Sequence, residues 1–214
     1  MINDGKIALE LAHYLLQIKA IRIETANPFR WASGWLSPIY CDNRKTLSHP
    51  KIRNFIKKEI KNLILNKFPD VEIIAGVATG AIAIGALVAD EMGLPFIYIR
   101  SASKGHGLGN QIEGDLSVGK KVVVVEDLVS TGMSSLTAVE ALRTSEMEVL
   151  GMVSIFNYGF DVAELSFKQH DCKLASLSDY EHLLKSALEE NYVSLEQMAA
   201  LQNWRKDPQN WKGI

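Results

Sequence analysis

Apolar residues in the first part of the chain recur every three or four positions, with polar residues between them. Such a stripe runs through residues 7–18 and predicts an amphipathic helix. A second stripe begins after Pro50, a residue suited to the first turn of a helix, and continues to Ile64. Between the two stripes, residues 24–44 alternate aromatic and turn-forming residues without a helical period, which predicts short strands and turns.

From residue 71 onwards, short apolar runs alternate with helical stripes. The runs predict strands at 71–75, 95–100, 122–126 and 149–156. The stripes predict helices at 81–92, closed by Gly93, and at about 131–143. Strands that are apolar throughout and alternate with helices indicate an α/β fold, in which a parallel sheet is flanked by helices on both faces.

The C-terminal part of the chain carries two patterns that typically open helices. Ser178 with Glu181, and Ser194 with Gln197, have the spacing of capping boxes and predict two helices. The tryptophan-containing segment 204–214 has no chemical motif, and we expect it to be either packed or disordered.

Composition limits the possible functions. The 214 residues include 23 Lys and Arg against 25 Asp and Glu, a formal net charge of -2. This balance disfavours a general nucleic-acid or membrane-surface binder but allows a local anion site. No apolar run approaches the roughly 20 residues that span a bilayer, and the N-terminus lacks a signal-peptide pattern. Cys41 and Cys172 suggest neither a disulfide framework nor a metal site. We therefore expect a single cytoplasmic domain of residues 1–214 with reduced thiols.

Two glycine-rich segments resemble nucleotide-binding motifs but lack essential parts. Residues 114–121 approach a P-loop, yet Lys121 stands where a magnesium-binding hydroxyl is required, and the segment leads into a strand. Residues 105–109 lack the last glycine of a dinucleotide fingerprint and the helix after it. Neither segment supports a nucleotide cofactor.

The strongest chemical pattern lies in residues 122–134. Four valines predict a buried strand that ends in Glu126 and Asp127 and leads through a short loop into a helix. A helix start offers N–H groups and a positive dipole end to a phosphate, and carboxylates accept hydrogen bonds from a sugar diol. The pattern therefore indicates a ribose 5-phosphate site. The alternative is a simple Ser130 or Thr131 helix cap, which two adjacent carboxylates at a buried strand edge disfavour.

Residues 122–134 resemble, at every position, the diphosphosugar signature of type I phosphoribosyltransferases. Residues 100–107 resemble the mobile basic loop of the orotate phosphoribosyltransferase family, and residues 33–42 resemble its N-terminal hood, here expected mainly at about 20–45. The resemblance implies the type I fold and transfer of ribose 5-phosphate from 5-phosphoribosyl 1-diphosphate to orotate in pyrimidine biosynthesis. A phosphoribosyltransferase for another base, or a non-catalytic regulator that senses the diphosphate, remains the alternative.

The resemblance also implies site residues and partners. Catalysis falls to Lys104, His106 and Asp127, and contact with orotate to Ser130, Ser37 and Tyr40. The residues implied for the phosphoribosyl diphosphate are Arg100, Lys104, His106, Glu126, Asp127, Leu128, Val129, Ser130, Thr131, Gly132, Met133 and Ser134. The implied cofactor is Mg²⁺, held mainly by the diphosphate and water instead of a protein metal site. The implied assembly is a homodimer with shared active sites, without nucleic-acid or membrane partners.

The chain departs from the family pattern at three places. Some members carry a lysine where this chain has Ala32, and another in the turn that here contains Thr79 and Gly80. An arginine that contacts orotate in some members is replaced near Asn157. The groups that bind the diphosphate and the orotate carboxylate therefore stay open. Gly76 and Gly80 are expected to serve through close backbone approach.

Overall fold

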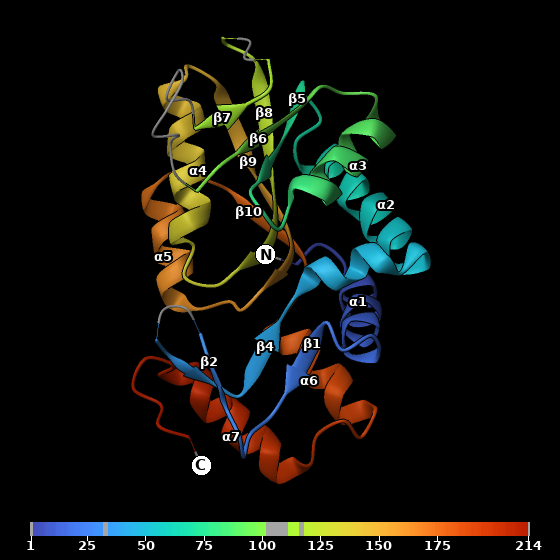
Figure 1. The fold of residues 1–214 in the computed structure, drawn as a ribbon, viewed down its shortest axis with the longest axis vertical. Helices are drawn as coiled ribbons and strands as arrows, with labels where there is room; N and C mark the ends of the chain where they lie inside the picture. Colours follow the sequence, from blue (N-terminus) through green and yellow to red (C-terminus); the bar gives the residue numbers. More distant parts are fainter. Residues whose placement is uncertain (1, 32–33, 102–110, 116–117, 214) are drawn as a thin grey trace.

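The computed structural model describes residues 2–31, 34–101, 111–115 and 118–213. A six-stranded sheet forms its centre, in the order β10–β9–β8–β5–β6–β7 (Figure 1). The strands are β5 Ile73–Val77, β6 Phe96–Ile99, β7 Ile112–Glu113, β8 Lys121–Val129, β9 Glu148–Asn157 and β10 Leu174–Asp179. Neighbouring strands are parallel except β6 and β7, which pair antiparallel at one edge. The predicted α/β fold with a parallel sheet is confirmed, with this short edge strand as an addition.

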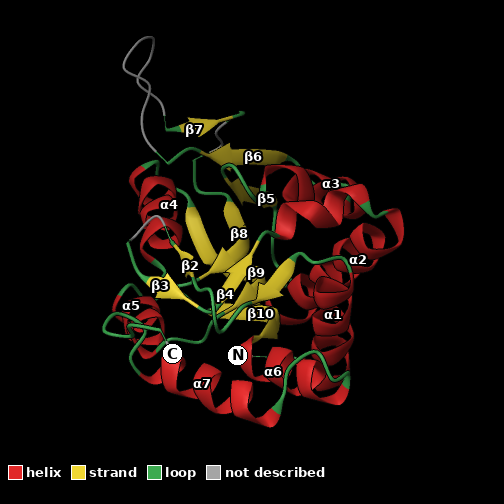
Figure 2. Ribbon diagram, turned by 60° about the horizontal axis from the view of Figure 1, so that its bottom comes forward, coloured by secondary structure: helices red, strands yellow, loops and turns green. Residues whose placement is uncertain are grey.

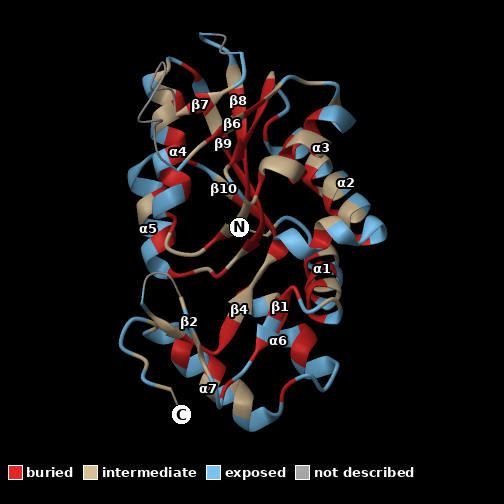
Figure 3. Cartoon of the chain, in the orientation of Figure 1, coloured by how far each residue is buried: buried red, intermediate tan, exposed pale blue. Residues whose placement is uncertain are grey.

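Helices cover both faces of the sheet, with α1, α2 and α3 on one side and α4 and α5 on the other (Figure 2). Their bounds are α1 Gly5–Gln17, α2 Pro50–Lys67, α3 Ile82–Met92, α4 Met133–Thr144 and α5 Asp161–Gln169. Alternate residues of β8 enter two separate cores, with Val123 and Val125 in one and Val122 and Val124 in the other. β5 is buried along its whole length, and β8 is buried from Val122 to Glu126 (Figure 3). Burial on both faces explains the run of four valines.

The N-terminal region forms a small layer beside the sheet, which we call the hood. In it, β1 Ile21–Ile23 pairs antiparallel with β4 Ile39–Cys41, and β2 Phe29–Arg30 pairs with β3 Leu36–Ser37. A 3₁₀ helix, η1 Asn43–Ser48, follows and leads into α2. The predicted short strands and turns are confirmed, and η1 is an addition.

Two C-terminal helices, α6 Tyr180–Glu189 and α7 Leu195–Lys206, lie next to the hood strands (Figure 1). The capping box of Ser194 and Gln197 opens α7 as predicted. The prediction for Ser178 is wrong. Asp179 caps α6 by accepting a hydrogen bond from the backbone N–H of His182. Ser178 lies inside β10, where its hydroxyl donates to a backbone oxygen of α1.

Several predicted boundaries shift, and two elements are new. β8 continues beyond the two carboxylates to Val129, so Leu128 and Val129 lie in the strand instead of the loop. α4 begins at Met133, after the loop that the sequence placed inside it. The strand β10 and the helix α5 were not predicted. In α5 only Ala163 and Phe167 are buried, which is too short a stripe to show a helical period.

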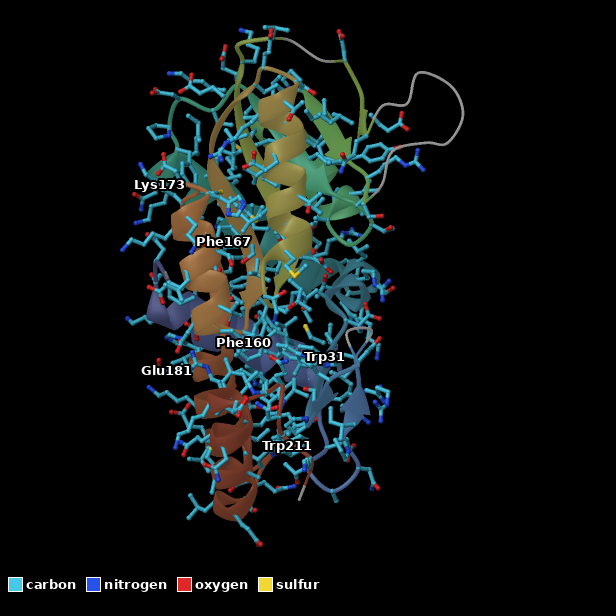
Figure 4. The ribbon with its side chains drawn as sticks, turned by 90° about the vertical axis from the view of Figure 1, so that its left-hand side faces the viewer. Trp31, Phe160, Phe167, Lys173, Glu181 and Trp211 are labelled. Carbon is cyan, nitrogen blue, oxygen red and sulfur yellow. The ribbon has the colours of Figure 1, made fainter. Side chains whose placement is uncertain are left out.

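Trp204 joins the hood to the rest of the chain. Its side chain is fully buried, and its Nε1 donates to the backbone oxygen of Leu36 at 3.1 Å. Its ring lies in a cluster with Trp31, Tyr158, Phe160 and Tyr180. Trp31 and Phe160 lie near each other where the hood meets the C-terminal helices (Figure 4). The packing expected as one possibility for this segment is therefore confirmed at Trp204.

Two further properties of the described residues concern the state of the cysteines and the length of the apolar helices. Cys41 and Cys172 are both free thiols, and burial raises the pKa of Cys172 to about 11. Within the described ranges, no helix combines the length and the apolar character needed to cross a bilayer.

Candidate active site

A cavity of about 380 Å³ opens at the carboxyl ends of β5 and β8, and we call it the carboxylate cavity. Three acidic side chains line it, Asp42 from the hood and Glu126 and Asp127 from β8. Ligands of open α/β sheets bind at this end of the strands. Its other described lining residues are Cys41, Arg44, Val77, Ala78, Thr79, Gly80, Leu128 and Ser134.

Glu126 is almost completely buried, and both of its oxygens are hydrogen-bonded. Oε1 accepts from the backbone N–H of Asp127 at 3.0 Å, and Oε2 accepts from the Ser135 hydroxyl at 2.9 Å. Burial, together with the charge of Asp127, raises the pKa of Glu126 well above its usual value. The carboxylate is thus held in place by its hydrogen bonds, while its negative charge is disfavoured.

Replacing Glu126 with glutamine should stabilise the protein at high pH. The amide can still accept from Asp127 N–H and can donate to the Ser135 oxygen, so it satisfies the same partners. A carboxyl with a raised pKa in the folded state weakens stability as pH rises through that pKa, and glutamine does not titrate. We expect the free energy of unfolding of E126Q to exceed that of the wild type at pH 8.

Urea unfolding across the pH range measures this difference. The advantage of E126Q should shrink towards zero as pH falls below the ordinary glutamate pKa, roughly 4.3. Ser135→Ala provides a control, because it removes one hydrogen bond without removing a charge. A stability difference that is independent of pH would contradict the assigned cause.

Asp127 is fixed from the hood and from the turn after β5. The Asn43 side chain donates to the backbone oxygen of Asp127 at 2.6 Å, although the two residues are 84 positions apart. A Cβ built on Gly80 would overlap the Asp127 carboxyl group, so only glycine leaves it space. Burial raises the pKa of Asp127, whereas the hydrogen bond from Glu126 and the nearby Arg44 charge oppose that rise.

The loop after β8 presents a helix start without a side-chain cap. Gly132 is the N-cap residue of α4, and no side chain accepts from the first-turn N–H groups. The hydroxyls of Ser130 and Thr131 therefore do not serve as the cap. Gly132 has φ of 83°, and a Cβ there would meet the Phe167 ring. The first amides of α4 remain available to an anion.

A second cavity of about 330 Å³ lies beside the first, and we call it the aromatic cavity. Three aromatic side chains line it, Trp31 and Tyr40 from the hood and Tyr158 after β9. The remaining described lining residues are Arg30, Cys41, Leu128 and Ser130. Cys41 and Leu128 line both cavities, so the carboxylate cavity and the aromatic cavity lie next to each other. Aromatic side chains are typical of the walls of sites that bind flat rings.

The structure brings many of the predicted site residues together. Glu126, Asp127, Leu128 and Ser134 line the carboxylate cavity, and Leu128, Ser130 and Tyr40 line the aromatic cavity. Thr131 and Gly132 lie in the turn before α4, and Met133 is the first residue of that helix. Neither cavity is lined by these three residues.

Other predicted residues lie elsewhere or outside the described part. Ser37 is fully buried. Its hydroxyl donates to the backbone oxygen of Ile39 and accepts from the backbone N–H of the same residue, and Ser37 does not line the aromatic cavity. Val129 is buried in β8, and Arg100 lies 3.6 Å from Glu113 at the sheet edge. Lys104 and His106 lie outside the described residues.

The predictions for Gly80 and Gly76 have different outcomes. Gly80 lines the carboxylate cavity, where its backbone approaches Asp127 closely. Gly76 instead faces the Phe96 ring and the backbone oxygen of Ala81, so its lack of a side chain serves packing between β5, β6 and α3. Ala32 lies outside the described residues.

Sequence reasoning missed Asn43 and Arg44. Both directly follow the hood motif and are polar, which is the only signal in the sequence. Their contacts with Asp127 and with the cavity arise from the packing of η1 against β8. It also missed Trp31 and Tyr158 as walls of the aromatic cavity.

Comparison with known proteins agrees with this geometry. The family described as "Phosphoribosyl transferase domain" matches residues 44–181. An orotate phosphoribosyltransferase of Phocaeicola vulgatus is 59% identical over 201 residues, covering 94% of this chain and 95% of the relative. One of Bacteroides thetaiotaomicron is 60% identical over 200 residues, with 94% coverage of each. The chain belongs to the orotate phosphoribosyltransferase family.

A solved structure of the same family supports the fold. The orotate phosphoribosyltransferase of Aeropyrum pernix is 26% identical and superimposes with a TM-score of 0.74, over 86% of this chain and 99% of that chain. The type I phosphoribosyltransferase fold expected from the signature is therefore confirmed. In family terms, the carboxylate and aromatic cavities lie where the signature strand, its loop and the hood meet.

Proposed function

We propose that this chain transfers the ribose 5-phosphate group from 5-phosphoribosyl 1-diphosphate to orotate, giving orotidine 5′-monophosphate and pyrophosphate for pyrimidine biosynthesis. One observation carries the proposal. Two carboxylates of β8 share a cavity wall with the uncapped start of α4, and this cavity adjoins an aromatic one. A sugar diol, a phosphate and a flat base can then be bound at once. The closely similar relatives carry the same activity in their names.

The phosphoribosyl group would span the end of β8. The amides at the start of α4, with Ser134, are suited to the 5′-phosphate, because N–H groups and the helix dipole both favour an anion. The Asp127 and Glu126 carboxylates can accept hydrogen bonds from the two ribose hydroxyls. Their negative charge also favours the cationic character that develops at the sugar when the bond to diphosphate breaks.

Orotate would occupy the aromatic cavity. Trp31, Tyr40 and Tyr158 provide flat walls for the ring, and Ser130 offers a hydroxyl. Arg30 lines this cavity and can offset the negative charge of the orotate carboxylate. As the bond between the ribose carbon and the diphosphate breaks, the orotate ring nitrogen forms its bond to that carbon, and the proton of this nitrogen passes to the departing diphosphate or to water. The enzyme mainly has to orient the ring and the ribose carbon for that attack.

Mg²⁺ fits this site as a companion of the substrate. Mg²⁺ prefers oxygen ligands and keeps several waters, and Asp42, Glu126 and Asp127 present such oxygens. Among the described residues no cluster of three or more metal-ligating side chains is found. In the proposed function the ion is held mainly by diphosphate oxygens and water. When bound, the ion neutralises charge on the diphosphate.

The decisive experiment follows orotate absorbance with phosphoribosyl diphosphate and Mg²⁺, with uracil, hypoxanthine and adenine offered as competing bases. We expect orotate to be consumed and the three competitors to leave its rate nearly unchanged. Consumption of another base without orotate would move the assignment to a different phosphoribosyltransferase. Binding of the diphosphate without turnover of any base would favour a regulator.

We also propose a homodimer in which the basic loop of one subunit reaches the site of the other, in a cytoplasmic enzyme. Lys104→Ala and Asp127→Asn should each be nearly inactive alone. Mixed dimers should regain part of the activity, because one of their two sites would combine both intact residues. Activity of the mixture, with subunit exchange checked by mass spectrometry of a tagged copy, measures this. Exchange without recovery would rule out shared sites.

A further inference from the structure

The carboxylate cavity has an unusual charge balance for a site that must bind a diphosphate. Asp42, Glu126 and Asp127 all line it, whereas Arg44 is its one positively charged residue among the lining residues that the structure describes. A diphosphate placed against three acidic groups needs positive partners, because uncompensated like charges repel strongly at such distances. Arg44 is the candidate that the chain itself brings into this wall.

The turn after β5 cannot supply a cation at position 80. Gly80 faces Asp127 so closely that any side chain there would displace the Asp127 carboxyl group. Thr79, its neighbour, is exposed and neutral. The turn therefore contributes backbone groups to the cavity, and the positive charge has to come from another element.

Arg44 is held at the cavity by its neighbours in the hood. The preceding Asn43 is buried and is anchored to the Asp127 backbone at 2.6 Å, which fixes the start of η1 against β8. The Nε of Arg44 donates to the Asp42 Oδ1 at 2.7 Å. This contact aligns the guanidinium group from one side. Within the described part of the chain, neither Nη group has a hydrogen-bond acceptor.

The exposure of Arg44 fits a binding role. Its side chain is 56% exposed, against 20% for its partner Asp42. An exposed guanidinium can donate two parallel hydrogen bonds to phosphate oxygens, and it is more weakly hydrated than an ammonium group. Arg44 and Asp127 line the same cavity, so the two groups lie near each other.

We infer that Arg44 binds the diphosphate of the phosphoribosyl donor through its Nη groups, and so supplies the positive charge that the Thr79–Gly80 turn lacks. The inference rests on the proposed function, since it names a ligand of the same site. The hood then has two roles. Its residues Trp31 and Tyr40 line the aromatic cavity proposed for orotate, and Arg44 binds the diphosphate leaving group.

The test compares Arg44→Gln, Arg44→Lys and the wild type by titration with inorganic pyrophosphate and by steady-state kinetics. Losing a charged hydrogen-bonding partner should raise the pyrophosphate Kd and the KM for phosphoribosyl diphosphate about 10- to 100-fold in R44Q. R44K should lose less, because it keeps the charge but not the planar fork. The KM for orotate should stay close to that of the wild type.

Lys45→Gln is the matched control, since it removes a positive charge from the neighbouring position of the same 3₁₀ helix, where the amine donates to the Lys19 oxygen. Its pyrophosphate Kd should equal that of the wild type. In the double variant Arg44→Gln with Thr79→Lys, an amine returns to the cavity from the other wall, and part of the affinity should return. A purely structural role of Arg44 would not allow this rescue.

Two results would overturn the inference. One is a pyrophosphate Kd for R44Q within about twofold of the wild type. The other is an equal rise of both KM values together with a lower Tm, which would mark Arg44 as a structural residue. Both are distinct from failure of the proposed function, in which the wild type itself would not convert orotate.

Discussion

Replacing Asp127 with asparagine should lower kcat/KM for phosphoribosyl diphosphate by about 10²- to 10³-fold, the usual effect of removing one electrostatic contact to a transition state. Asp127 lies on the wall of the carboxylate cavity, with its backbone fixed by Asn43. The amide keeps the shape of the side chain but removes the negative charge that favours a cationic sugar. Steady-state kinetics with both substrates measures the loss.

The fold of D127N should remain intact, because burial raises the pKa of Asp127 and a neutral side chain relieves that unfavourable charge. Tm should therefore be equal to or above that of the wild type. Asp70→Asn is a matched control, since this exposed carboxylate lies 3.5 Å from Lys121, away from the lining of both cavities. Normal turnover in D127N would contradict the role given to Asp127.

Gly80→Ala offers an independent way to disturb the same carboxylate. Its Cβ would occupy the space of the Asp127 carboxyl group, so the side chain has to rotate away. We expect a loss of kcat/KM similar to that of D127N although no charge is removed. If G80A is as active as the wild type, the position of Asp127 in the cavity does not matter for turnover.

Replacing Trp204 with alanine should destabilise the protein by about 3–5 kcal/mol, the range observed for large aromatic side chains in cores. Trp204 is fully buried, lies against Trp31, Tyr158 and Phe160, and donates a hydrogen bond to Leu36 of the hood. Its removal leaves a cavity and an unpaired backbone oxygen. Urea or thermal unfolding measures the loss.

The same change should raise the KM for orotate. Trp31 and Tyr158 line the aromatic cavity and rest against Trp204, so the walls lose their support. Trp211→Ala is the control of the same residue type, at a partly buried position near the C-terminus (Figure 4). It should cost far less stability. An unchanged orotate KM in a destabilised W204A would show that the cavity keeps its shape without the cluster.

Many helices and strands could be predicted from the periodicity of apolar residues, because each of these patterns depends only on residues close together in the sequence. The helix from Pro50, the helix closed by Gly93 and the valine strand depend on side chains only a few positions apart. α5 and β10 escaped prediction because their buried faces are short. The helix cap at Ser178 failed because two neighbouring residues could both serve, and packing of β10 against α1 selected Asp179.

Residues 122–134 could also be recognised from the sequence as a candidate site, since one continuous segment supplies the carboxylates, the loop and the helix start. The residues proposed to contact orotate were harder to identify from the sequence. Tyr40 lines the aromatic cavity, but Ser37, three positions earlier, is turned into the hood and bonds to Ile39. Side-chain direction in a short irregular strand depends on the turn around it, which sequence patterns describe poorly.

The sequence by itself determined the α/β order of elements, the family signature and the family to which the chain belongs. Only the tertiary structure decided which groups surround Asp127: Asn43 from 84 positions away, the glycine at 80, and Arg44 in the cavity wall. The physical reason is the range of the interactions. Periodicity follows from neighbours along the chain, whereas a charge balance and the close approach of the Gly80 backbone to the Asp127 carboxyl group exist only after distant segments have packed together.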